Sequence, residues 1–148
     1  MKVTTLMLSL ILIFSSLSGC LAGDHGGDWS HITFAATDSS SAVSNGTSDE
    51  LVDIVMVPFE DEDFGWDVTN ITILVGDELF ICSTGYSTGC YIKQGEVTND
   101  QSGFIWAGGE TLVLVENEVD ICSQECEVVV VITSEDIIIP GTPIVNVK

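Results

Sequence analysis

The side chains of this 148-residue chain that could do chemistry are first of all its five cysteines. Cys20 follows an apolar N-terminal run, and the other four lie in the second half of the chain. An even number of cysteines in an exported chain predicts two disulfides. Four cysteines allow three pairings, and sequence alone does not decide among them. We favour the two local pairs because each closes a single loop: Cys82 with Cys90, and Cys122 with Cys126.

Cys20 stands at the end of a segment that is typical of export. An uncharged, mostly apolar run from Val3 to Leu17 follows Lys2, and Ser18-Gly19-Cys20 comes next. This predicts a signal peptide over residues 1–19, not a membrane span. Its end resembles the lipobox of prokaryotic lipoproteins, an aliphatic residue and two small residues before a cysteine. The resemblance implies that Cys20 carries diacylglycerol and anchors an extracytoplasmic, cell-surface protein to the membrane. An ordinary cleaved signal containing a cysteine is the alternative.

The charge balance excludes several classes of function. Twenty-three Asp and Glu residues oppose three lysines and no arginine, so this acidic protein has a net charge of −20. Nucleic acid is excluded as a partner because lysine and arginine side chains must neutralise its phosphates. The only histidines are His25 and His31, which precede the predicted domain. Without a histidine base or an arginine to hold an anion, we expect no enzyme and no catalytic residue.

The residues that follow Cys20 have the composition of a linker. Gly23 to Glu50 is rich in Gly, Ser, Thr, Asp and Asn and shows no sustained periodicity. Residues 20–50 are therefore predicted to be the lipidated cysteine and a flexible acidic tether. His25 and His31 lie there beside Asp24 and Asp28, but we expect no metal site because a flexible tether fixes no ligand geometry.

Residues 51–148 form a series of short β-type runs without helical spacing. Val and Ile are abundant, and Gly, Asn and Pro interrupt the runs. The pattern predicts a single all-β domain, a Greek-key β-sandwich of about eight strands with immunoglobulin-like topology as one possibility. The expected runs are Leu51–Phe59, Val68–Val75, Glu78–Cys82, Cys90–Lys93, Gly103–Trp106, Glu110–Glu116, Val119–Cys122, Glu127–Thr133, Ile137–Ile139 and Ile144–Val147.

Four segments of this domain suggest a family. Asp53–Phe59 followed by Asn70–Leu79 resembles the opening of a cupredoxin domain, and Gly109–Leu112 resembles its later turn. Cys122–Cys126 is similar to the C-S-x-x-C loop of the dinuclear copper centre in cytochrome oxidase subunit II. The resemblance implies a cupredoxin-like sandwich.

The copper ligands of that family are missing. Such centres need two imidazoles beside the thiolate, often with a methionine. Residues 51–148 contain no histidine, Cys90 stands near the expected first histidine, and Met56 is the only methionine there. The resemblance therefore implies the fold without electron transfer. It also brings Cys90, Cys122 and Cys126 to one end, where three thiolates could hold Cu(I) or Zn(II) unless disulfides close that end.

The densest acidic cluster is Glu60-Asp61-Glu62-Asp63, with Asp67 four residues on. Carboxylates suit Ca²⁺, but the cluster lacks the spacing of a known calcium loop, so we expect solvated surface. Phe64 and Trp66 beside it are expected at the edge of the core.

We expect a lipid-anchored binding or structural module with no cofactor, whose partners are the membrane and an unidentified protein or surface ligand. The alternative is a thiolate protein that binds copper or zinc.

Overall fold

The computed structural model describes residues 32–57, 64–85, 88–95 and 105–148. Within these ranges the chain forms strands and no helix, so the expected all-β fold is confirmed. The strands are β1 (Thr33–Asp38), β2 (Glu50–Val57), β3 (Phe64–Gly65), β4 (Thr69–Val75), β5 (Glu78–Ser83), β6 (Gly89–Gln94), β7 (Ile105–Trp106), β8 (Thr111–Asn117), β9 (Cys126–Ser134), β10 (Ile137–Ile139) and β11 (Ile144–Val147).

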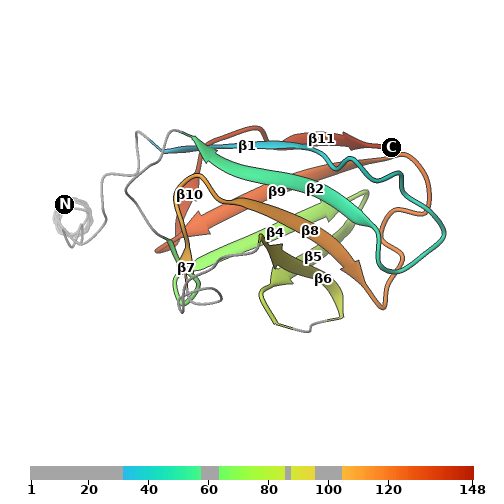
Figure 1. Cartoon of the computed structure of the whole chain (residues 1–148), viewed down its shortest axis with the longest axis horizontal. Helices are drawn as coiled ribbons and strands as arrows, with labels where there is room; N and C mark the ends of the chain where they lie inside the picture. The colour runs from blue at the N-terminus through green and yellow to red at the C-terminus, as the bar shows by residue number, and fades with distance from the viewer. Residues whose placement is uncertain (1–31, 58–63, 86–87, 96–104) are drawn as a thin grey trace, which may run out of the picture.

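Nine of these strands form one sheet that curls on itself. Its order is β1-β2-β8-β6-β5-β4-β9-β10, and β11 also pairs with β9. All pairs are antiparallel except β5 with β6. The edge strand β1 meets the chain after β10, where the Phe34 N–H donates to the Pro140 carbonyl (3.0 Å) and the Thr142 N–H donates to the Phe34 carbonyl (3.0 Å). The result is a nearly closed barrel whose walls belong to one continuous sheet (Figure 1).

The core is built by simple alternation along the strands. Successive side chains of a strand point to opposite faces, so every second residue enters the barrel. Ile71 and Ile73 of β4 are buried, as are Leu112 and Leu114 of β8. Burial of one such side chain is worth roughly 1.5–3 kcal/mol. These strands are held mainly by the branched aliphatic residues that the sequence places at alternate positions.

The two ends of the barrel differ. The aromatic end, on the left in Figure 1, holds the start of β1, the end of β2 and the small sheet of β3 with β7. The disulfide end, on the right, holds the loop between β8 and β9, which contains Cys122. β1 begins at the aromatic end because its first residue, Thr33, lies opposite Val57, the last residue of β2. Near the same end of β2, Val55 lies opposite Thr111, the first residue of β8.

Strand β1 corrects the expected domain boundary, because it lies inside the range assigned to a flexible tether. Ile32, Phe34 and Ala36 are buried, and β1 pairs along its whole length with β2. The alternation of Ile32, Phe34 and Ala36 is short, and the segment around it is rich in Gly, Ser, Thr and Asp, so the overall composition obscured it. The folded domain therefore begins by Ile32 and not at Leu51.

The prediction of a strand over Val119–Cys122 is also wrong. Glu118 has a positive φ of 62°, which turns the chain out of the β8 direction. The backbone N–H groups of Ile121 and Cys122 donate to a side chain, not to a neighbouring strand. This segment is a loop because its hydrogen bonds are supplied by Glu116.

Candidate functional site

Several residues singled out by sequence lie outside the described residues. These are the lipidation candidate, the two histidines with their neighbouring aspartates, and the main acidic cluster: Cys20, Asp24, His25, Asp28, His31 and Glu60-Asp61-Glu62-Asp63. Of the calcium candidates only Asp67 is described, and its side chain is exposed in the turn between β3 and β4.

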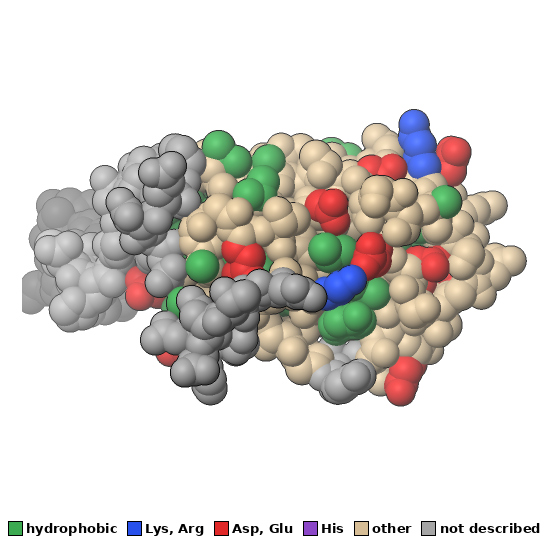
Figure 2. All heavy atoms as spheres, in the orientation of Figure 1, with side chains coloured by type: hydrophobic (Ala, Val, Ile, Leu, Met, Phe, Trp, Pro, Cys, Tyr) green, Lys and Arg blue, Asp and Glu red, His purple; other side chains and the backbone are tan. Residues whose placement is uncertain are grey.

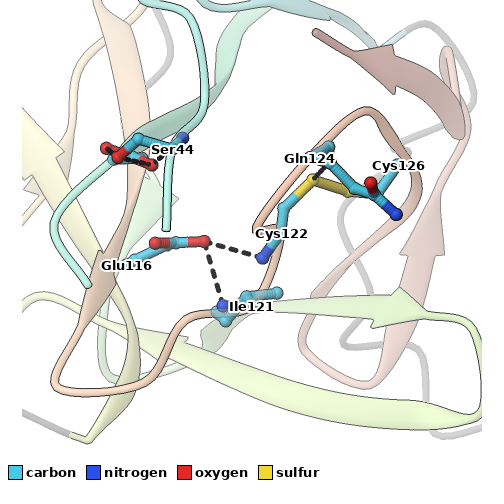
Figure 3. The surroundings of a disulfide bond; sticks show 7 residues. Ser44, Glu116, Ile121, Cys122, Gln124 and Cys126 are labelled. Atoms are coloured by element: carbon cyan, nitrogen blue, oxygen red, sulfur yellow. Dashed lines mark hydrogen bonds between the residues drawn. A yellow bond between two sulfur atoms is a disulfide. The ribbon is translucent and has the colours of Figure 1, made fainter. Parts of the chain in front are cut away.

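Both local disulfides are present in the structure. Cys82 and Cys90 are joined where β5 and β6 pair, with their Cα atoms 4.5 Å apart. Cys122 and Cys126 close the loop that leads into β9, with a Cα–Cα distance of 5.9 Å (Figure 3). These are the pairs favoured from the sequence. A disulfide sulfur is not a thiolate ligand, and among the described residues no three His, Cys, Asp or Glu side chains are arranged to hold a metal ion.

A buried acid organises the disulfide end. Leu112, Leu114 and Glu116 alternate along β8 and all point into the barrel, so the carboxyl group of Glu116 is fully buried. Its Oε1 accepts hydrogen bonds from the N–H groups of Ile121 (3.0 Å) and Cys122 (2.8 Å), as Figure 3 shows. Its Oε2 has no hydrogen-bond partner. Glu116 therefore clamps the loop that carries the Cys122 disulfide to the wall of the barrel.

Several influences act on the protonation of Glu116. Burial raises the pKa of its carboxyl group. The N–H donors of Cys122 and Ile121 act in the opposite direction, while the charges of Asp49 and Asp120 raise the pKa further, and the net shift is upward. Sequence reasoning missed this residue. The available signal was its inward position in the alternation that begins at Leu112.

The aromatic end is closed by stacked side chains. The ring of Trp66 lies parallel to that of Trp106, with 6.1 Å between centroids, and Phe64 is buried beside them. The Trp66 Nε1 donates to Gln94 Oε1 (3.3 Å), and the Trp106 Nε1 donates to the Glu110 carbonyl (3.0 Å). The expectation that Phe64 and Trp66 lie at the edge of the core is confirmed. Both indole N–H groups are engaged within the fold.

The largest unexplained feature is an exposed apolar surface on the wall of the barrel. Strand register aligns outward side chains of β5, β4, β9, β10 and β11 in three rows, which we call the β4–β9 face. The rows are Leu79–Leu74–Val129–Ile144, Ile81–Thr72–Val131 and Asn70–Thr133–Ile138. Leu79 and Ile81 are each 65% exposed and Ile138 is 68% exposed.

The β4–β9 face is uncharged, although the chain is strongly acidic. None of its ten side chains is Asp, Glu or Lys, and carboxylates stand only at its ends, with Glu127 beyond the first row and Glu135 beyond the third. On the side of the molecule that Figure 2 shows, by contrast, Asp and Glu side chains are scattered among apolar ones. An apolar groove of about 360 Å³, lined by Val131, Ile138 and Pro140 among others, adjoins the face. Contiguous apolar surface of this kind marks interaction sites in soluble proteins.

No protein-family model matches this chain, and no curated protein matches it. Among the described residues no helix has the length and apolar character needed to cross a membrane. Three features of the described residues are candidates for a functional site: the aromatic end, the disulfide end and the β4–β9 face. Of these three, the β4–β9 face is the one that leaves large aliphatic side chains exposed.

Proposed function

We propose that this chain is a lipid-anchored binding module on the extracytoplasmic side of a membrane, and that it binds another macromolecule through the β4–β9 face. The observation that carries the proposal is the exposed, uncharged apolar surface in a chain with a net charge of −20. Leaving side chains such as Leu79 and Ile81 in water gives up the free energy of burying them. A bound partner recovers that free energy.

The anchor belongs to the proposal and rests on the lipobox resemblance that ends at Cys20. Two disulfides support an extracytoplasmic setting, since disulfides persist in oxidising compartments. We propose no enzymatic activity and no cofactor. The resemblance to cupredoxins enters only as a proposed kinship of fold, in which Cys90 pairs with Cys82 and is not a metal ligand.

The anchor and the start of β1 limit how far the domain can stand from the membrane. Cys20 and Ile32 are twelve residues apart in the chain. Twelve fully extended residues span at most about 40 Å. Because β1 begins at the aromatic end, that end faces the membrane in this proposal. The β4–β9 face lies on the wall of the barrel. In this orientation it points sideways, parallel to the plane of the membrane.

The anchor is tested by comparing the wild-type chain with Cys20→Ser in a host that processes lipoproteins. We expect the wild-type protein in the membrane fraction, with the mass of a diacylglycerol on its N-terminal peptide. Cys20→Ser should lack that mass. An unlipidated wild-type chain that is cleaved and released would contradict the anchor.

The binding role is tested in the same cells with a photo-crosslinking amino acid at Ile81 on the β4–β9 face. The matched control carries the same amino acid at Thr111, which is exposed on β8, outside the β4–β9 face. We expect a covalent adduct from position 81 and none from position 111. Absence of any adduct from position 81 in the anchored protein would refute the binding role.

A further inference from the structure

We infer that the partner on the β4–β9 face is a second copy of this chain, so that anchored copies pair side by side on the membrane. This inference rests on the proposed function, because it names the macromolecule that the same face binds. It is carried by the charge pattern of the face, the alignment of its rows across neighbouring strands and the short connection to the anchor.

Charge restricts where two copies can meet. Each copy has a net charge of −20, and like charges brought together across an interface cost several kcal/mol. The three rows of the β4–β9 face contain no charged side chain, and their only hydrogen-bonding side chains are Asn70, Thr72 and Thr133. Contact through this face therefore buries aliphatic surface without burying a carboxylate. Permanent homodimer interfaces are apolar in this way.

The shape of the face suits a copy of itself. A two-fold dimer uses the same patch on both subunits. The first row, from Leu79 to Ile144, crosses four neighbouring strands, about 14 Å at the usual strand spacing. Because the sheet curls into a barrel, two such faces meet along the middle of their rows, with their strands roughly aligned. Thr72 lies in the middle row between Ile81 and Val131, near the centre of the contact.

The anchor makes this pairing geometrically direct. The stretch of at most about 40 Å between Cys20 and Ile32 keeps the aromatic end of every copy near the same membrane. A two-fold axis along the membrane normal then brings two β4–β9 faces together and leaves both anchors on one side. Confinement to a surface raises the effective concentration of the copies, so modest affinity is sufficient.

The carboxylates at the ends of the face predict how salt affects the pairing. In this arrangement Glu127 approaches Glu127 of the second copy, and Glu135 approaches its counterpart. The screening length falls from about 10 Å at 0.1 M salt to about 3 Å at 1 M. Dimerisation therefore strengthens as salt rises. A basic partner docked on the same face would instead bind more weakly as salt rises.

The test is sedimentation velocity of the whole mature chain, residues 20–148 with Cys20→Ser, at 0.1 M and 1 M NaCl. We expect a monomer–dimer equilibrium whose Kd is at least tenfold lower at the higher salt concentration. Thr72→Glu places a carboxylate at the centre of the face, and like-charge repulsion there should raise Kd about a hundredfold. The matched control Thr111→Glu makes the same substitution outside the face and should leave Kd within about twofold of the Cys20→Ser parent.

Circular dichroism and thermal melting establish that both variants are folded. If Thr72→Glu fails to fold, Leu79→Thr with Ile81→Thr replaces it, because threonine keeps the strand preference while removing apolar surface. A monomer at both salt concentrations, or a dimer that responds equally to Thr72→Glu and Thr111→Glu, overturns the inference. The crosslinking test separates the two proposals: an Ile81 adduct with twice the chain mass supports the second copy, whereas an adduct of another mass overturns the second copy and leaves the binding role standing.

Discussion

The clamp at the disulfide end leads to the sharpest prediction about stability. Glu116→Ala removes the acceptor for the buried N–H groups of Ile121 and Cys122, whereas Glu116→Gln keeps a side-chain oxygen in the same place. An unsatisfied buried donor costs about 1–3 kcal/mol, and relief from burying the carboxyl group offsets part of this. We therefore expect Glu116→Ala to lower the free energy of unfolding by about 2–4 kcal/mol at pH 7, and Glu116→Gln to change it by less than about 1.5 kcal/mol.

The same residue should contribute to the pH dependence of stability. Its folded-state pKa is raised above the ordinary value of 4.5, mainly by burial. A group with a raised folded pKa binds its proton more tightly in the folded state. Its contribution to stability is therefore fully present below pH 4.5 and is lost as the pH rises through the folded pKa. The wild-type chain should lose stability relative to Glu116→Gln as the pH is raised from 4 to 7.

Urea unfolding of the wild-type chain and both variants at pH 4 and pH 7 measures these differences. Taking wild type minus Glu116→Gln at each pH cancels the other carboxyl groups of this acidic chain. Equal destabilisation by Ala and Gln at pH 7 would refute the role of the side-chain oxygen as an acceptor. A wild-type advantage over Gln that grows from pH 4 to pH 7 would refute the sign of the pKa shift.

Three further predictions concern the closure of the barrel. Phe34→Ala should lower the free energy of unfolding by about 3–5 kcal/mol in urea titrations because β1 is part of the core. An unchanged urea midpoint would mean that this segment is a tether after all. Gly141→Ala should cost about 1–3 kcal/mol in thermal melts because its Cβ would overlap the Phe34 carbonyl and ring, and a variant as stable as wild type would contradict that contact. Replacing both Cys82 and Cys90 by alanine should lower the free energy of unfolding by about 2.5 kcal/mol through lost loop closure, and this difference from wild type should disappear when both chains are titrated under reducing conditions, which also open the Cys122–Cys126 disulfide in each.

Features that depend on neighbouring residues could be predicted from the sequence. β4 and β8 were expected within one or two residues of their observed bounds, because alternating aliphatic side chains specify a strand locally. The pairing of Cys82 with Cys90 was favoured because the two are close in the chain, and the structure contains it. The tether prediction failed at β1 because Ile32, Phe34 and Ala36 make a pattern too short to stand out from the polar residues around it.

Features that join distant segments were not predictable in the same way. Glu116 is recognisable as a clamp only once Ile121 and Cys122 turn back toward the inside of β8. The lack of a histidine in residues 51–148 can be seen from composition. Composition does not reveal the β4–β9 face, which became the candidate for function. Outward aliphatic residues occur in several strands, and most of them are isolated when considered strand by strand.

The sequence by itself determined the charge of −20, the all-β character, the candidate anchor at Cys20 and the cysteines available for disulfides, because composition and local spacing are sufficient for these. Only the tertiary structure decided that β1 closes the barrel and that Leu79, Leu74 and Val129 stand in one row. The physical reason is strand register. A shift of one residue between β4 and β9 would turn one strand's aliphatic row to the opposite side of the sheet, and register is set by the packing of the whole core.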